Sequence, residues 1–323
     1  MIKLLQNLNN LSVPPGSVGT KIAADLFAYG TGYPFLTAWQ QLDPQNRATA
    51  LLCKKEDSWL LCTGSAADFS EKTKKTDFAE GTHLTEKADL TEKADLAEGA
   101  DFAEGADFAE GADFAEGADF AEGADFAEGA DFAEGADFAE GADFAEGADF
   151  AELTAFVQAV GGRHLQLQGP GNLTALKSPV LFAEYCLQPA GRPAAPAAVQ
   201  QNNLKGCYQI LYSSPNSSIA KVEYNGWYAD LSHKIRHGYA FCATLNGAAA
   251  VVSHLFGGSA VLSGVAVLPQ LRGKGRGRQL LAALPALLPG VRRFYVCCAP
   301  QTEPFYRACG FVKTGRTVTV GRL

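Results

Sequence analysis

The stretch Val267-Leu268-Pro269-Gln270-Leu271-Arg272-Gly273-Lys274-Gly275-Arg276-Gly277 places three glycines in alternation with basic residues. An apolar run, 260–267, leads into it, and a run of good helix formers begins near Arg278. The predicted order is therefore strand, glycine-rich turn, helix. Glycines let a backbone approach a ligand closely, and the first turn of a helix presents N–H groups that have no internal partner. Such a turn suits a pyrophosphate group.

The charge around this turn also favours an anionic ligand. From Leu231 to Thr302 the chain has eight Lys and Arg residues and no Asp or Glu. The spacing is neither the Walker pattern G-x-x-x-x-G-K-[ST] nor a clean dinucleotide fingerprint G-x-G-x-x-G. In addition, no acidic residue follows about 20 positions later to hold a ribose. A nucleic-acid footprint is a further interpretation of the basic cluster, but we do not expect nucleic acid as a partner.

The residues before the turn predict a meander of strands. Apolar runs at 239–245 and 248–255 flank Asn246-Gly247, a pair typical of a two-residue hairpin turn. Gly257-Gly258 then turns the chain into the third apolar run, 260–267. A fourth strand is predicted at 293–298, after the helix.

Two motifs in this part of the chain resemble those of the GNAT superfamily of N-acyltransferases. Residues 270–275 have the form Q-x-x-G-x-G, and residues 305–311 have the form F-Y-x-x-x-G-F. The two motifs stand in the family's order, separated by a helix and a strand. The resemblance is clear over 239–323, extends plausibly from about 205, and implies a GNAT-type twisted mixed sheet flanked by helices.

The resemblance implies roles for particular residues. The main chain of Val265, Ala266 and Val267 would pair with the pantetheine amides of acetyl-CoA. The pyrophosphate would be held by the residues of the turn, which are Arg272, Gly273, Lys274, Gly275, Arg276 and Gly277. Tyr306 would be the general acid for the leaving thiolate, and its other interpretation is a packed aromatic side chain. Ala299 stands where the family often has an asparagine, so one cofactor contact is in doubt.

The general base is less well defined by the sequence. An amine nucleophile must lose a proton, so a carboxylate or an imidazole is expected near the thioester. His254, beside the strand expected to bind pantetheine, is the catalytic candidate that we retain, although a histidine on an apolar strand is often a hydrogen-bonded core residue. Glu223, Asp230 and His233 are further candidates, and the polar run 230–238 is a candidate acceptor-binding segment.

These features together predict an acyl-CoA-dependent N-acyltransferase. The donor would be acetyl-CoA, the acceptor a primary amine of a small molecule or a peptide, and attack would be direct, without a metal. The alternative is a catalytically degenerate GNAT domain that binds CoA for regulation or structure. The absence of an 18-residue apolar stretch and the eight scattered cysteines predict a cytoplasmic protein with no membrane partner.

A six-residue repeat interrupts the first half of the chain. From Asp77 the sequence settles into DFAEGA units, and Asp77–Glu152 carries a formal charge of -23, whereas the other 247 residues carry +15. The pentads at 67–71 and 148–152 match, and Leu153, Phe156, Val157 and Val160 follow at helical spacing. We interpret the tract as a duplicated helix start. Disorder, a β-solenoid and other ordered forms all remain open for it.

The rest of the N-terminal part predicts a small α/β unit with no catalytic motif. The short apolar runs 48–53 and 58–62 indicate a hairpin, and a further strand is expected at 164–167. We therefore expect an α/β protein that has an N-terminal α/β subdomain and a GNAT-type core. The expected segments are 1–72 and 148–200 for the subdomain with its linker, 73–147 for the repeat insertion, and 201–323 for the acyltransferase core.

Overall fold

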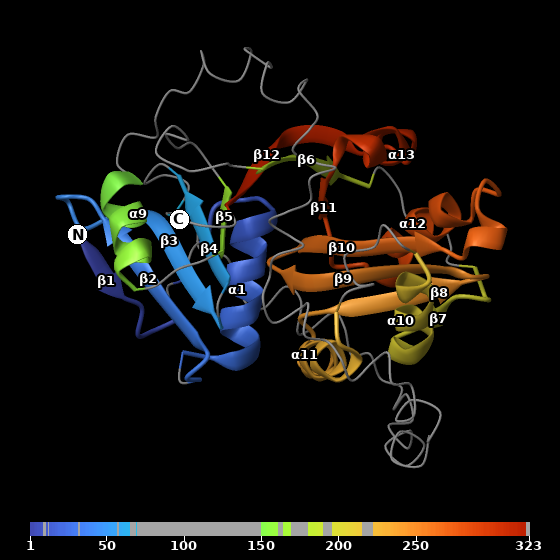
Figure 1. The fold of residues 1–323 in the computed structure, drawn as a ribbon, viewed down its shortest axis with the longest axis horizontal. Helices are drawn as coiled ribbons and strands as arrows, with labels where there is room; N and C mark the ends of the chain where they lie inside the picture. Colours follow the sequence, from blue (N-terminus) through green and yellow to red (C-terminus); the bar gives the residue numbers. More distant parts are fainter. Residues whose placement is uncertain are drawn as a thin grey trace.

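The protein is a mixed α/β structure built on one mixed sheet flanked by helices, as the sequence predicts (Figure 1). The computed structural model describes residues 1–8, 11, 13–31, 33–56, 58–64, 69, 150–160, 164–168, 180–189, 196–214 and 222–320. The acidic repeat, the first pentad except Phe69, and the capping residue Asp149 lie outside these residues. The strand order in the sheet is β1-β2-β3-β4-β5-β12-β6-β11-β10-β9-β8-β7.

The N-terminal half, which we define as residues 1–187, confirms the predicted hairpin and strand. Its strands are β1 (Ile2–Leu4), β2 (Leu36–Leu42), β3 (Ala48–Lys55), β4 (Ser58–Thr63), β5 (His164–Gln168) and β6 (Val180–Leu187). Its helices are α1 (Ser17–Tyr29) and α9 (Phe150–Ala159). Leu153 and Val157 of α9 are buried, whereas Val160 lies beyond the helix end and is 40% exposed, so the predicted apolar stripe is one residue shorter than expected.

The C-terminal half, which we define as residues 200–320, contains the predicted meander. Its strands are β7 (Gln200–Gln201), β8 (Phe241–Leu245), β9 (Ala248–Phe256), β10 (Ser259–Val267), β11 (Arg293–Cys298) and β12 (Val312–Val320). Its helices are α10 (Leu204–Tyr212), α11 (Tyr224–Arg236), α12 (Arg276–Leu287) and α13 (Glu303–Ala308), with short 3-10 turns η6 (Pro269–Leu271) and η7 (Pro300–Thr302). Asn246 and Gly247 have φ angles of 49° and 79°, which confirms the predicted hairpin turn.

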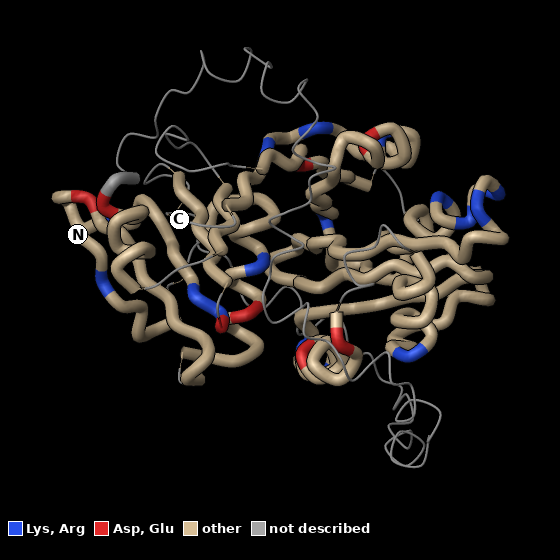
Figure 2. Tube along the Cα trace, viewed as in Figure 1, with Lys and Arg blue, Asp and Glu red and all other residues tan. Residues whose placement is uncertain are grey.

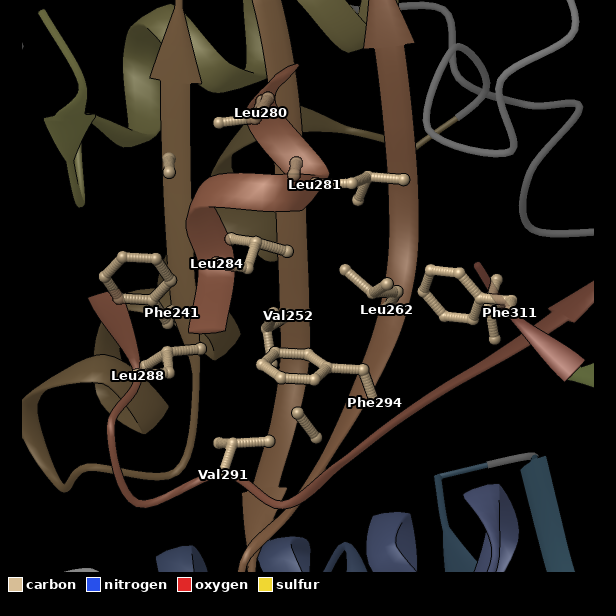
Figure 3. Packing of buried hydrophobic residues seen from close by; sticks show 14 of the residues in the cluster. Phe241, Val252, Leu262, Leu280, Leu281, Leu284, Leu288, Val291, Phe294 and Phe311 are labelled. Carbon is tan, nitrogen blue, oxygen red and sulfur yellow. The ribbon is translucent and has the colours of Figure 1, made fainter. Parts of the chain in front are cut away.

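The two faces of the C-terminal strands are covered by different helices. Leu280, Leu281 and Leu284 of α12 pack on strand residues that include Val252 and Leu262 (Figure 3). Tyr306 of α13 belongs to the same buried cluster. Helices α10 and α11 pack in a separate cluster on the opposite face. The strands are therefore buried on both sides, which explains their nearly continuous apolar sequences.

The two halves exchange strands. Strand β6 of the N-terminal half lies between β11 and β12 and is antiparallel to both. Strand β12, from the end of the C-terminal half, lies between β5 and β6. The sheet is consequently continuous from one half to the other, and residues 180–187 share their hydrogen bonds with the C-terminal strands.

Helix α1 packs between the halves. It contacts β4 and β5 on one side and β9 and β10 on the other, in the centre of Figure 1. Ala23 and Ala24 lie against Phe256, at the end of β9. No helix in the described ranges is long and apolar enough to cross a membrane.

Candidate functional site

The parallel strands β10 and β11 separate part-way along their length. They pair over Ser259–Leu262 and Arg293–Val296, and the pairing stops there. Among the described strands, β10 continues to Val267 with only β9 beside it, and β11 continues through Cys297 and Cys298 with only β6 beside it. Register shifts around Leu262 mark the point at which β10 bends away. A gap therefore opens between two strand edges whose backbone groups can pair with an extended polar ligand.

The predicted glycine turn follows β10 at the end where β10 and β11 are no longer paired. Gly273 and Gly275 have φ angles of 73° and 71°, and a side chain at either position would point into open space. Helix α12 begins directly after Gly275, which caps it without a side-chain hydrogen bond. The N–H groups of its first turn are thus available to an anion. Gly277 has a different role, since an added Cβ would lie 3.3 Å from both Phe305 and Val267.

Basic side chains surround the turn, as Figure 2 shows at the start of α12. The Arg272 guanidinium donates hydrogen bonds to the Val267 carbonyl at 3.1 Å and to the Ser214 hydroxyl at 3.1 Å. Arg276 donates to the Asn246 carbonyl at 2.6 Å. These bonds hold two cations at the turn without neutralising them, because carbonyl and hydroxyl oxygens carry no formal charge. The turn therefore remains suited to a polyanion.

Tyr306 lies on the side of the gap covered by α12 and α13. Its ring makes edge contacts with Phe305 and Phe311, and Cys298 of β11 belongs to the same buried cluster. Burial raises the pKa of the Tyr306 hydroxyl, with the neighbouring thiols Cys298 and Cys309 adding to the shift. The phenol is therefore protonated at neutral pH, as a proton donor must be.

His254 lies on the opposite side of the sheet, in a closed polar network. Its Nε2 is 3.0 Å from the Lys234 ammonium and 3.4 Å from an Asp25 oxygen, and its Nδ1 is 2.7 Å from the Ser253 hydroxyl. Burial, and then the charge of Lys234, lower the pKa of His254 to about 4. The imidazole is neutral at pH 7, and Lys234 occupies its Nε2 lone pair. Its role in catalysis stays a prediction.

The other candidate bases have structural partners. Glu223 caps α11 by accepting hydrogen bonds from the backbone N–H groups of Asn225 and Gly226, both at 2.7 Å. Asp230 pairs with Lys55 and Lys234. His233 stacks on Tyr29 with ring centroids 4.5 Å apart. Asp230 and His233, which belong to the predicted acceptor-binding run 230–238, thus contact residues of the N-terminal half.

Sequence reasoning missed three polar residues of β6 and α1, two of which contact or lie opposite Cys297, where β11 leaves β10. Glu184 of β6 lies directly opposite Cys297 of β11, so their side chains share a face. Ser17, at the start of α1, has its hydroxyl 2.6 Å from Glu184 Oε2 and 3.1 Å from Cys297 Sγ. Lys21 lies one turn further along α1. In the sequence of α1, polar residues recur at every fourth position and therefore share one face of the helix. A search for apolar periodicity does not detect this pattern.

Comparisons with known proteins identify the domain that contains the gap. Residues 227–313 match the family model described as an acetyltransferase (GNAT) domain. No curated protein matches the chain. Among the part of the chain that the structure describes, no group of three His, Cys, Asp or Glu residues is placed to hold a metal ion.

Several solved structures match the chain at low sequence identity and with TM-scores below 0.5. An acetyltransferase of the GNAT family from Colwellia psychrerythraea has 11% identity and a TM-score of 0.42, with 100% of both chains covered. A tandem GNAT protein from the clavulanic acid biosynthesis pathway has 12% identity and a TM-score of 0.40 over 99% of this chain and 98% of the other. A GCN5-related N-acetyltransferase from Sphaerobacter thermophilus has 14% identity and a TM-score of 0.35, covering 50% of this chain and 60% of its own.

The family match includes β10, the glycine turn, α12, β11 and α13, which are the elements that build the gap. Residues 227–313 are therefore similar to a GNAT acetyltransferase domain.

Proposed function

We propose that the protein is an acyl-CoA-dependent N-acyltransferase that transfers an acetyl group from acetyl-CoA to a primary amine. The observation that carries the proposal is the edge of β10 that β11 leaves unpaired, followed by a basic glycine turn. The helix that begins at this turn has no side-chain cap. The edge supplies backbone partners for the pantetheine amides over Val265–Val267. The turn over Arg272–Gly277 supplies N–H groups and cations for the pyrophosphate.

In the proposed reaction the neutral amine attacks the thioester carbonyl carbon directly. A C–N bond forms, the C–S bond breaks, and the sulfur leaves with the bonding electron pair. Tyr306 donates its hydroxyl proton to that sulfur, and the amine nitrogen loses its proton to water, which restores Tyr306 through solvent. The buried Tyr306 hydroxyl keeps its proton at neutral pH, so that the proton is available to the leaving sulfur.

Acetyl-CoA binding and CoA thiol release test the proposal separately. Calorimetry measures acetyl-CoA affinity, and a thiol reagent follows CoA release in the presence of a panel of primary amines. The proposal expects both binding and amine-dependent release. Binding without release for every amine would instead support a CoA-binding domain without turnover, and the absence of binding would contradict both interpretations.

A further inference from the structure

Helix α1 carries a polar stripe toward the C-terminal strands. Ser17, Lys21, Asp25 and Tyr29 recur at every fourth position, which places them along one face of the helix. Ser17 and Asp25 are 0% and 2% exposed although both are polar. Buried polar groups require hydrogen-bond or ionic partners, and the kind of partner differs along the stripe.

At the Asp25 end of the polar stripe, the positive and negative charges balance. Asp25 Oδ1 lies 2.7 Å from the Lys234 ammonium and 3.4 Å from that of Lys55. The Asp230 carboxylate lies 2.6 Å from Lys55 and 3.0 Å from Lys234. Burial alone would raise the pKa of Asp25, but the neighbouring cations lower it well below its ordinary value. Two carboxylates thus balance two ammonium groups, and no charge is left over.

The end of the stripe near Ser17 is also satisfied. Glu184 Oε2 accepts hydrogen bonds from the Ser17 N–H at 2.9 Å and from the Ser17 hydroxyl at 2.6 Å. Glu184 Oε1 lies 3.3 Å from the Thr314 hydroxyl, which can donate to it. The carboxylate therefore has partners on both oxygens from its immediate surroundings.

Lys21, in the middle of the stripe, lacks a charged partner. Its ammonium donates to the neutral Gln166 Oε1 at 2.8 Å, and no carboxylate of the described residues lies within 4.0 Å of it. Lys21 is half-buried, and burial lowers its pKa against the more distant attraction of the Asp25 and Glu184 carboxylates. A half-buried cation loses part of its hydration, and an anion bound to it offsets that loss. This ammonium is therefore prepared for an anion that is not part of the described protein.

Its position connects Lys21 to the gap. Helix α1, which carries Lys21, contacts both β10 and β11, the two strands that separate. Cys297 is the first residue of β11 beyond the last pair with β10, so it lies where the gap begins. The Cys297 side chain is turned to the α1 side, where the Ser17 hydroxyl contacts it at 3.1 Å. The cation thus lies beside the narrow end of the gap, on the face opposite Tyr306.

We propose that Lys21 binds an anionic group on the acceptor, so that the substrate is a primary amine that also carries a carboxylate or a phosphate. The inference rests on the acyltransferase function proposed above. It makes the N-terminal half a contributor to acceptor choice, while the C-terminal half binds the acyl donor.

A first experiment measures thermal stability and requires no turnover. Lys21→Met removes a cation that has no carboxylate partner, so its Tm in sodium chloride should be at least that of the wild type. Replacing chloride by acetate or phosphate at constant ionic strength should raise the Tm of the wild type by a few degrees more than that of Lys21→Met. Gln166→Glu should also lack the additional Tm increase in acetate or phosphate, because it places a permanent carboxylate beside the Lys21 ammonium.

Lys3→Met is the matched control, since Lys3 also donates to a neutral amide oxygen, Asn46 Oδ1, at 3.2 Å but is exposed. This variant should keep the anion-dependent Tm increase of the wild type. A Tm of Lys21→Met several degrees below that of the wild type in chloride would make Lys21 a structural residue. An equal anion effect in wild type and Lys21→Met would also overturn the proposal.

A second experiment compares acceptors that differ by the anionic group. The matched pairs are alanine with ethylamine and phosphoethanolamine with ethanolamine, and CoA release is measured for each. The anionic member should have the higher kcat/KM, and Lys21→Met and Gln166→Glu should lower its value by about 10- to 100-fold, the worth of a charge-assisted hydrogen bond. The two pairs show whether the site takes carboxylate or phosphate.

The two proposals fail in different ways. Equal or higher turnover of the neutral amines, with acetyl-CoA still bound, would contradict the role of Lys21 and leave the acyltransferase function intact. Failure to bind acetyl-CoA, or to release CoA with any amine, would contradict the acyltransferase function. In that case the anion-dependent Tm of the first experiment still decides whether Lys21 binds an anion.

Discussion

The two halves of the molecule repeat one order of elements but differ where the third strand ends. In each half a helix precedes an antiparallel meander, a second helix follows, and the next strand is parallel to the third. In the N-terminal half, β4 and β5 stay paired from Ser58 to Cys62. In the C-terminal half, β10 and β11 separate after Leu262, with five residues of β10 still to come.

The connections that follow these strands differ in charge as well. Between β10 and α12 the chain makes a short basic turn. Between β4 and α9, the corresponding connection contains the acidic repeat. The comparison teaches that the same order of elements occurs with and without separated parallel strands and a short basic turn. The proposed cofactor site rests on these two features, which only the C-terminal half combines among the described residues.

The largest expected effect comes from placing a negative charge in the C-terminal turn. Gly275→Glu should weaken acetyl-CoA binding by about 100-fold or more, because a carboxylate beside a pyrophosphate costs several kcal/mol. Isothermal calorimetry measures the affinity. Gly30→Glu is the control in the N-terminal half, since Gly30 also has a positive φ, 77°, and open space around it, while its ψ of 177° differs from the 4° of Gly275. Unchanged affinity in a folded Gly275→Glu protein would remove the turn from the site.

The rate of acetyl transfer should depend on the hydroxyl of Tyr306 and not on that of Tyr185, which lies in the same buried cluster. Tyr306→Phe is expected to lower kcat by about 10²- to 10⁴-fold, the range typical of lost general acid catalysis, with little change in the KM for acetyl-CoA. Tyr185→Phe is the control, because its hydroxyl bonds to Glu303 at 2.6 Å and to Arg307 at 2.9 Å in the same cluster. A Tyr306→Phe enzyme with the wild-type kcat would make Tyr306 a packing residue.

The network between the halves should make stability depend on pH through His254. Its pKa is about 4 in the folded protein and 6.5 ordinarily, so protonation favours the unfolded state. The resulting stability is complete above pH 6.5 and is lost as the pH falls from about 6.5 to about 4. Urea unfolding at pH 5 and pH 7.5 should show a smaller difference for His254→Gln than for the wild type.

The same variant tests His254 as a general base. A base with a pKa of about 4 would produce an acid limb of kcat/KM near that pH, and His254→Gln would remove it. The occupied Nε2 leads us to expect that only the stability profile changes. Loss of the limb together with a large fall in kcat at pH 7 would assign the base role to His254.

The smallest effect is expected from removing the acidic connection of the N-terminal half. Excision of 72–152 joins Glu71 to Leu153, so Glu71 can take over the contacts of Glu152 with Gln41 and the amino terminus. The excised protein should fold and should bind acetyl-CoA more tightly than the full chain only at low salt, because charge effects are screened beyond about 8 Å at 0.15 M. Calorimetry at several salt concentrations measures the difference. Loss of folding would contradict the interpretation of a duplicated helix start.

The sequence predicted the C-terminal half well because its signals are local. The Asn246-Gly247 turn, the apolar strands and the glycine turn each follow from neighbouring residues, and β8 to β10 lie within two residues of the expected bounds. The positions of Glu184 and Lys21 could not be predicted in this way. They reach the gap only because β6 enters the sheet beside β11 and α1 packs between the halves, and both events join segments more than 100 residues apart.

The strand exchange also constrains how the chain can reach its native state. Strand β5 gains its second neighbour only when β12 arrives, and β12 is the last described strand along the chain. Both neighbours of strand β6 are C-terminal strands, β11 and β12. A ribosome therefore releases the N-terminal half with one open edge on β5 and with β6 unpaired on both sides, until nearly the whole C-terminal half has been synthesised. High contact order of this kind slows folding, and it makes the early chain a client for chaperones that shield exposed strands.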